Sequence, residues 1–365
     1  MSQALTPATL AELRRPRPYP AVSILMPTHR REPDNAQDPV RLRNLVAEAK
    51  ERLQADPAVS RADRIDVVEQ LDKALAQIDL VHSEDGLAVF VAPGEHQVWT
   101  LGRSVAARVV LSDTFLTRNL VATQAADRPY WVLVIAADHA RLWSGGPEHV
   151  TEWTGGAFPL ARSLEDPDSE RKERIGDLPS TFTDELTRQF LREADTAVGS
   201  VLGADPRPLF VVGEAAALSL LNDVGTAVKG AAARIPHGGL AHGSAEAVWQ
   251  TARPAVEAQQ QQAVTDALDE LDRARGRKEF VAGIDEVWQK VGDGRVALVA
   301  VEENYRVTMR DDGNHLLHAE PGEEGAREDI VDEIVERALD TGAQVRFVPD
   351  EQLADSGRIA AVLRY

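Results

Sequence analysis

The sequence predicts an α/β protein built from three consecutive α/β domains with mixed sheets, and three observations lead to this prediction. Its 365 residues, 43% of them hydrophobic, exceed what a single domain of ~100–200 residues needs. Short apolar runs typical of buried strands alternate along the chain with segments of helical periodicity. Because such alternation implies partly parallel sheets covered by helices, we place the domains at residues 1–125, 126–252 and 253–365.

The expected first domain opens with the apolar run Ala-Val-Ser-Ile-Leu-Met at residues 21–26, which predicts a buried strand closed by Pro27. Three prolines, counting Pro27, lie in the connection up to residue 39, so we expect an irregular loop there. Apolar residues at helical spacing then predict two helices, at about residues 40–54 and 61–81. Further strands are expected at residues 86–91, 95–101 and 105–111.

The two later domains are expected to continue this alternation. A long polar segment without apolar periodicity lies between residues 155 and 183, and such loops inside compact domains are usually functional or disordered. A glutamine-rich helix at about residues 254–275 is expected to lead into the third domain. In the second domain we predict strands at 130–136, 140–143, 150–153 and 208–212 and a helix at 183–202. In the third we predict helices at 278–291 and 327–341, strands at 295–301, 344–348 and 359–364, and hairpin-like strands around Tyr305 and His315.

Composition and charge exclude several classes of protein. The chain has no cysteine, which rules out disulfides, thiol catalysis and cysteine-based metal sites. Its 40 basic and 59 acidic side chains give a net charge of −19, which argues against a non-specific nucleic-acid coat. No apolar run approaches the ~20 residues of a membrane-spanning helix, and the first residues lack the apolar stretch of a signal peptide. We therefore expect a cytoplasmic protein without membrane contact.

The acidic charge is distributed unevenly. Residues 1–150 hold 17 basic and 19 acidic side chains, whereas residues 296–365 hold 7 and 16. An RNA-facing surface is therefore expected near the N-terminus, and the acidic C-terminal face is expected to meet protein or solvent. Arginines flank the first strand and open the next helix, where a phosphate would also meet free backbone N–H groups. Ordinary surface arginine is the alternative explanation of this cluster.

No enzyme signature is complete. The run His237-Gly238-Gly239-Leu240 resembles the oxyanion loop of some serine hydrolases, but the nearest candidate for the required nucleophile elbow, at Ser244, fails the spacing. A glycine loop is the favoured interpretation. The pairs His237/His242 and His315/His318 lack the spacing of a metal-binding helix. We predict no catalytic residue, no cofactor and no metal, and a protein that is not an enzyme.

The clearest resemblance lies in the last third of the chain. A glutamine-rich helix and Gly-Arg-Lys at 276–278 precede Ala-Leu-Val-Ala-Val-Glu-Glu-Asn-Tyr at 297–305 and Thr-Gly-Ala-Gln-Val-Arg at 341–346. The chain closes with Ser-Gly-Arg-Ile-Ala-Ala-Val-Leu-Arg-Tyr at 356–365, the most specific of these motifs. In this order they resemble the C-terminal domain of the archaeal–eukaryotic peptide-chain release factors and their relative Pelota.

The N-terminal stretch is similar to the bacterial homologues of this superfamily. Tyr-Pro-Ala-Val-Ser-Ile-Leu-Met-Pro-Thr-His-Arg at 19–30 and Gln-Asp-Pro-Val-Arg-Leu-Arg-Asn-Leu at 37–45 look like the branch that contains the ribosome-hibernation factor Balon. The resemblance covers nearly the whole chain and implies a release-factor/Pelota-like architecture. It implies a first domain at the decoding centre, a second pointing toward the peptidyl-transferase centre and a third contacting elongation factor EF-Tu. On this basis we predict rRNA contacts at His29, Arg30, Arg31, Arg41, Arg43, Arg171, Lys172 and Arg174.

The sequence departs from the release factors at their functional motifs. They carry Gly-Gly-Gln on the loop between an early strand and the long helix of the middle domain, where this chain has residues 160–180 without that motif. Its Gly-Gly pairs precede Pro147, Ala157 and Leu240 instead. The Asn-Ile-Lys-Ser motif that reads stop codons is also missing. A protein with the shape of a release factor but without its hydrolytic motif is expected to occupy the ribosomal A site rather than terminate translation.

The prediction for function is therefore a hibernation factor, a monomer off the ribosome, that occupies the A site and inhibits translation without hydrolysing peptidyl-tRNA. One alternative is a catalytically active ribosome-rescue factor or peptidyl-tRNA hydrolase that uses another loop residue. A second alternative is a protein-interaction module unrelated to ribosomes. A peptide-release assay separates the first alternative from passive occupancy, and co-sedimentation with ribosomes tests the second.

Overall fold

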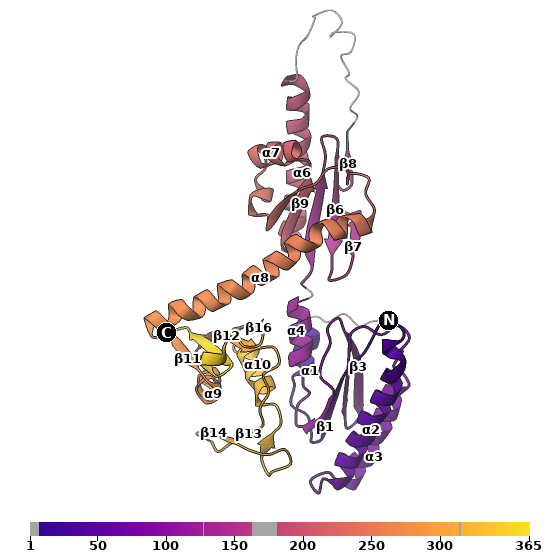
Figure 1. The fold of residues 1–365 in the computed structure, drawn as a ribbon, viewed down its shortest axis with the longest axis vertical. Helices are drawn as coiled ribbons and strands as arrows, with labels where there is room; N and C mark the ends of the chain where they lie inside the picture. The colour runs from indigo at the N-terminus through magenta and orange to yellow at the C-terminus, as the bar shows by residue number, and fades with distance from the viewer. Residues whose placement is uncertain (1–6, 127, 163–180, 314) are drawn as a thin grey trace, which may run out of the picture. The chain divides into compact units, whose positions relative to one another are not determined.

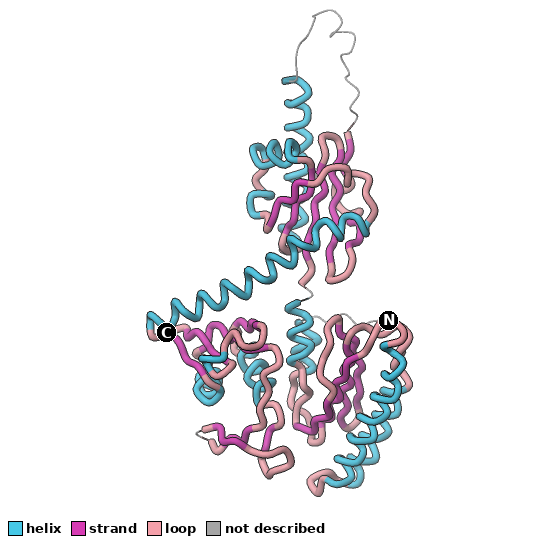
Figure 2. Tube along the Cα trace, viewed as in Figure 1, coloured by secondary structure: helices cyan, strands magenta, loops and turns pink. Residues whose placement is uncertain are grey.

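The computed structural model describes residues 7–126, 128–162, 181–313 and 315–365 (Figures 1 and 2). Within these ranges the chain is an α/β protein with four sheets, of which two are mixed and two are antiparallel, so the predicted fold class is confirmed. Contacts between residues divide the chain into two compact units, 1–126 together with 264–365, and 127–263. The division into three domains stays a prediction. No helix among the described residues is long and apolar enough to cross a bilayer.

Residues 7–126 form a sheet with helices on both faces. The sheet is antiparallel throughout, in the order β3-β2-β1-β4, and its central strand is buried from Ala21 to Met26. Alternate residues of that strand point to opposite faces, so Ile24 packs with α2 and α3 while Leu25 packs in the cluster that contains α1 and α4. The elements are α1 (Pro7–Leu13), β1 (Ala21–Pro27), η1 (Asp34–Gln37), α2 (Asp38–Ala55), α3 (Arg61–Leu75), β2 (Gly86–Ala92), β3 (Glu95–Leu101), β4 (Arg108–Ser112) and α4 (Arg118–Ala126).

The unit of residues 127–263 has a mixed sheet in the order β10-β9-β5-β6-β7, with β8 paired to β6. Strands β5, β9 and β10 are parallel, and β6, β7 and β8 join antiparallel. Leu133 of β5 faces α6 and α7, whereas Val132 faces the first half of α8. The elements are β5 (Tyr130–Ile135), β6 (His139–Gly145), β7 (Val150–Trp153), β8 (Leu160–Ala161), α6 (Thr181–Ala204), β9 (Leu209–Gly213), α7 (Ala215–Val224), η2 (Ala227–Gly230), β10 (Ala233–Pro236) and α8 (Ala245–Arg277).

Residues 264–365 hold a mixed sheet in the order β11-β17-β12-β16 and a small antiparallel sheet in the order β14-β13-β15. Val299 of β12 packs in the cluster that contains α9 and α10, and its neighbour Leu298 packs against the second half of α8. The elements are β11 (Phe280–Ala282), α9 (Ile284–Gly292), β12 (Val296–Glu302), β13 (Met309–Asp311), β14 (Leu316–His318), β15 (Ala326–Arg327), α10 (Ile330–Asp340), β16 (Gln344–Val348), η3 (Ala354–Ser356) and β17 (Ile359–Leu363).

Three predicted helices differ most from the structure in their bounds. The helix expected from Pro254 begins at Ala245, because Val248 and Ala252 are buried against the middle sheet and the helix continues through Pro254. The helix expected to reach residue 81 ends at Leu75, although Ile78 beyond its end still packs on the same core. In the expected helix 278–291, Gly283 has a φ of 82°, so residues 280–282 pair with β17 and the helix starts afterwards.

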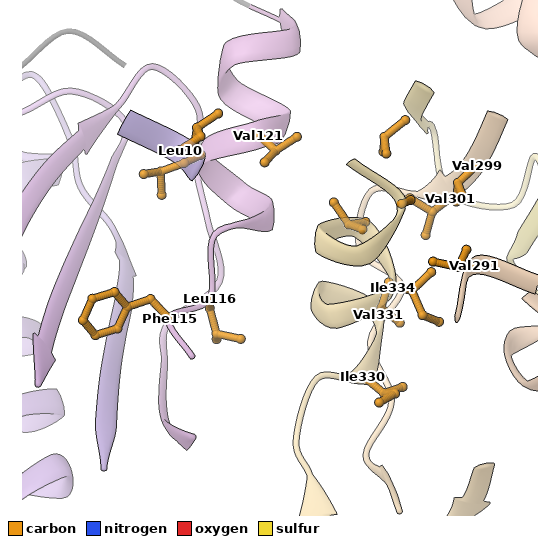
Figure 3. Close-up of a cluster of buried hydrophobic side chains, with 14 of the residues drawn as sticks. Leu10, Phe115, Leu116, Val121, Val291, Val299, Val301, Ile330, Val331 and Ile334 are labelled. Atoms are coloured by element: carbon orange, nitrogen blue, oxygen red, sulfur yellow. The ribbon is translucent and has the colours of Figure 1, made fainter. Parts of the chain in front are cut away.

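Among the described residues, the elements that were not predicted from the sequence include α1, α4, α7 and β10. Each is short, and β10 alternates between half-buried and exposed residues rather than forming a continuous apolar run. The strand β10 adds to the edge of the middle sheet beside β9, and α4 packs against α10 of residues 264–365 (Figure 3 labels Val121 and Ile334 from these two helices). Short elements of this kind depend on the tertiary structure around them.

Candidate nucleic-acid interface

The five predicted N-terminal residues lie on the connection between β1 and α2 and on the first turns of α2. A buried carboxylate, Asp38, organises this connection: Oδ2 accepts a hydrogen bond from the His29 backbone N–H at 2.8 Å, and Oδ1 accepts one from Arg41 Nη1 at 2.7 Å. The His29 ring lies within 3.0 Å of the same Oδ1 through Nδ1. As the first residue of α2, Asp38 also lies at the helix end where a negative charge is stabilised.

Arg30 lies on the other side of this connection and forms a bidentate pair with Asp85, with Nε–Oδ1 at 2.8 Å and Nη2–Oδ2 at 3.1 Å. Thr28 donates from its backbone N–H to the carbonyl of Asp85 and from Oγ1 to that of Glu84. Ser83 Oγ donates to the carbonyl of His29. We call residues 28–31 with residues 38–43 the His29 corner. Hydrogen bonds with residues 83–85, which lie much further along the chain, fix its backbone.

Arg31 and Arg43 differ from the other arginines of the corner because both are exposed. Neither forms an ion pair with any carboxylate in the described part of the chain. Val40, one helical turn before Arg43, exposes 51% of its surface. The corner therefore presents two arginines to solvent beside an apolar side chain, while Arg30 and Arg41 are already held by carboxylates.

A polar groove of about 560 Å³ adjoins the corner and was not predicted from the sequence. It runs from Thr28 along the connection that follows α3 to β3, and its polar lining includes the imidazoles of His82 and His96, the amides of Gln77 and Gln97, and the carboxylates of Asp79 and Glu84. His96 is held between two amides, with Nε2 at 2.7 Å from Gln77 Nε2 and Nδ1 at 2.7 Å from Gln70 Oε1. Groups of this kind recognise the hydrogen-bonding edges of unpaired RNA bases. The lining residues come from separate parts of the chain between residues 28 and 100, so no local sequence pattern marks them.

In the unit of residues 127–263, β8 and α6 flank the segment where the release factors would carry their hydrolytic motif. The predicted contacts Arg171, Lys172 and Arg174 belong to residues 163–180, which lie outside the described residues. Next to β8, the rings of His139 and His242 meet at 4.6 Å between centroids. The two histidines belong to β6 and to the loop that follows β10.

The glycine loop of residues 237–243 is held in place rather than built as an oxyanion site. Leu240 is buried under the middle sheet, and Arg141 Nη1 donates to the carbonyls of Ala241 and Gly243 at 3.2 and 3.1 Å. Ser244 Oγ accepts from the Ala247 backbone N–H at 3.3 Å and so caps α8. This serine therefore serves as a helix cap and not as part of a nucleophile elbow.

Of the histidines considered for metal binding, His315 pairs with a carboxylate. His315 Nδ1 lies 2.8 Å from Asp285 Oδ2, and the hydrogen bond to this carboxylate raises the pKa of His315. No group of three or more histidine, aspartate or glutamate side chains with the geometry of a metal site occurs among the described residues. His315 is largely exposed, so its pairing belongs to the protein surface.

A known protein family matches the middle of the chain. The model of bacterial archaeo-eukaryotic release factor family 3 matches residues 129–295, which confirms the predicted resemblance to the bacterial relatives of the release factors. Over that segment the chain is similar to this family. No curated protein matches it significantly.

Several solved structures are similar to the chain at low sequence identity. An archaeal Pelota, described as ribosome-bound with ABCE1, is 12% identical over 100% of this chain and 95% of its own, with a TM-score of 0.45. Dom34 of S. cerevisiae is described as a translation termination-like factor that interacts with Hbs1. It is 11% identical over 75% of this chain and 74% of its own, with a TM-score of 0.41. The archaeal termination factor aRF1 is 19% identical over 98% of this chain and 96% of its own, with a TM-score of 0.25.

Proposed function

We propose that this protein binds the ribosome, occupies the A site and inhibits translation without hydrolysing peptidyl-tRNA. One observation carries the proposal: residues 129–295 match a release-factor family, while Gly-Gly-Gln occurs nowhere in the 365 residues. Hydrolysis of the peptidyl ester needs a group that positions water at the ester carbonyl. A chain of this kind without that group is suited to occupancy. Contact with EF-Tu through residues 253–365 belongs to the same proposal.

The RNA contacts are proposed for the His29 corner and the adjoining groove. Arg31 and Arg43 are exposed for phosphate contacts, and Arg30 and Arg41 are held beside them by Asp85 and Asp38. Each phosphate contact that is lost should lower the salt dependence of binding by about one unit. Bases that are not paired would enter the groove beside His96.

Sedimentation through sucrose with purified ribosomes tests the site. The variant Arg31→Ala/Arg43→Ala should lose ribosome affinity at ~150 mM salt and show a salt slope that is smaller by about two units. The matched control is Arg61→Ala/Lys229→Ala, which removes the same charge from exposed positions outside the corner. Equal losses in both variants would contradict the proposed site, and absence of the parent protein from the ribosomal fraction would contradict the function.

The alternative of an active hydrolase has one observation in its favour, the imidazole pair next to β8. Imidazole is the most common general base in proteins, and the His139 ring lies within 3.0 Å of a carboxylate, Asp138 Oδ1. Release of labelled peptide from ribosomes by the pure protein, abolished in His139→Ala, would support the hydrolase. Release at the background rate by both proteins supports passive occupancy.

A further inference from the structure

The ion pairs that join residues 1–126 to residues 264–365 share one arrangement of charge. Five ion pairs join these two parts among the described residues, and in each the arginine belongs to residues 1–126 and the carboxylate to residues 264–365. The pairs are Arg14–Asp340, Arg52–Glu328, Arg103–Glu303, Arg108–Asp329 and Arg118–Asp329. We call this set the joint.

The centre of the joint is buried. The Asp329 side chain is only 2% exposed; its Oδ2 accepts a hydrogen bond from Arg108 Nη1 at 2.7 Å and lies 3.4 Å from Arg118 Nη2. The neighbouring Asp332 accepts a hydrogen bond from the Arg118 backbone N–H at 2.7 Å. Arg118 is as buried as Asp329 and donates from Nη1 to the carbonyl of Tyr305 at 2.6 Å. The two parts of the unit thus meet through charged groups that have left water, beside the apolar cluster in which α4 packs against α10.

The carboxylates of the joint do not give every arginine there a hydrogen bond. Arg306 lies in the same place, and burial together with the charges of Arg118 and Arg108 lowers its pKa to about 10. Arg118 Nη2, Arg306 Nε and Asp329 Oδ1 are all buried without a hydrogen-bond partner. A buried polar group without a partner costs stability, so the joint is imperfectly satisfied in its closed form.

The acidic part carries an excess of negative charge. Residues 264–365 hold 24 acidic and 13 basic side chains, against 16 and 15 in residues 1–126. Guanidinium groups bind carboxylates and phosphates through the same charge-assisted hydrogen bonds. A cleft of about 1000 Å³ lined by Arg52, Glu328 and Asp329 reaches the edge of the joint, so solvent has access there.

We infer that Arg52, Arg103 and Arg108 form a second RNA-binding face, which the carboxylates of residues 264–365 occupy in the free chain in place of RNA phosphates. Binding of RNA at this face requires the two parts of the unit to separate. Desolvation offsets much of the attraction in buried ion pairs, so separation is a change that phosphate contacts at the same arginines can drive. The choice of RNA as the ligand rests on the proposed function.

The direct test removes the covering carboxylates from the full chain. The triple variant Glu303→Gln/Glu328→Gln/Asp329→Asn should bind a short fluorescein-labelled RNA duplex at least about tenfold more tightly than the parent, because a closed joint lowers apparent affinity by the open fraction. Each added phosphate contact should steepen the salt dependence by about 0.9. The variant Glu303→Gln/Glu328→Gln keeps the buried aspartate and tests the same claim if the triple variant does not fold.

Two controls separate the joint from net charge. The variant Asp269→Asn/Glu320→Gln/Asp355→Asn changes the net charge equally at exposed residues outside the joint and should stay within about twofold of the parent affinity. Adding Arg103→Gln/Arg108→Gln to the triple variant should abolish its gain. An equal gain in the exposed control, or no gain in either joint variant, would overturn the inference.

Separation of the two parts has its own readout. The chain has no cysteine, so Ala62→Cys/Ala354→Cys provides two labelling positions, one in each part, for energy transfer. Addition of the RNA duplex should reduce the transfer, and unchanged transfer at saturating RNA would contradict the inference. The RNA-duplex experiment uses no ribosomes. A negative result here therefore does not contradict the sedimentation test of the proposed function. A negative sedimentation result, in turn, does not prevent the RNA-duplex result from being interpreted.

Discussion

The His29 corner and the joint are both built on a buried aspartate that holds arginine, yet they differ in reach. Asp38 holds His29 and Arg41, which lie within nine positions of it, and the corner leaves Arg31 and Arg43 exposed. Asp329 holds Arg108 and Arg118, more than 200 positions away, and Arg118 is buried. The comparison teaches that similar pairs serve either to present neighbouring charges or to conceal the charges they contact.

The largest expected effect comes from the centre of the joint. Asp329→Ala removes the carboxylate from two arginines that have little exposure, and leaving buried charges uncompensated should lower the free energy of unfolding by about 3 kcal/mol. Urea denaturation of the full chain measures it. A loss of less than about 1 kcal/mol, the range of exposed pairs, would show that the joint is hydrated and the comparison mistaken.

The corner should respond less strongly. Asp38→Ala removes the acceptor of the His29 N–H and of Arg41, whose side chain is partly exposed, so the expected loss is about 2 kcal/mol. Hydrogen exchange should show the change in the His29 amide and leave amides of β16 unaffected. Uniform loss of protection across both elements would mean that Asp38 stabilises the whole unit rather than its corner.

The pH dependence of stability sharpens the contrast. Burial and the neighbouring Asp329 raise the pKa of Asp332 to about 7, so the folded chain binds this proton more tightly than the unfolded chain. Stability from this group is therefore present below the unfolded pKa near 4 and is lost as the pH rises through about 7. Between pH 6 and 8 the free energy of unfolding should fall by about 1 kcal/mol more in the parent than in Asp332→Asn. Identical profiles would contradict this assignment.

The smallest effect on stability is expected at the exposed arginines. Arg31→Ala/Arg43→Ala should change the free energy of unfolding by less than about 0.5 kcal/mol, since neither side chain is paired among the described residues. Thermal denaturation beside the ribosome assay checks this. A large loss of stability would mean that reduced ribosome binding reports unfolding and not the loss of phosphate contacts.

The sequence was sufficient where the determining contacts are local. The buried strand β1 follows from one apolar run, and the arginines of the corner follow from clustering within a few residues. Asp85, the partner of Arg30, lies 55 positions away, so no spacing pattern joins the two. The groove beside the corner also combines the connection after α3 with β3, and it was missed for the same reason.

The joint shows the same limit more clearly. The sequence indicated an acidic C-terminal face that meets protein or solvent, and the structure shows that carboxylates of this face meet arginines of residues 1–126. Charge counts reveal an imbalance between two segments, but they do not reveal which side chains approach one another. The same holds for α8, whose start at Ala245 depends on the burial of Val248 and Ala252 against strands distant in the sequence.

The central claim is that the protein binds ribosomes without releasing the nascent peptide. The most direct measurement adds the pure protein to ribosomes that carry labelled peptidyl-tRNA in the P site and an empty A site. Bound protein and released peptide are then quantified in the same samples. The account predicts that the protein sediments with the ribosomes while peptide release stays at the background rate. Release that increases with bound protein, or ribosomes that sediment without it, would contradict the account.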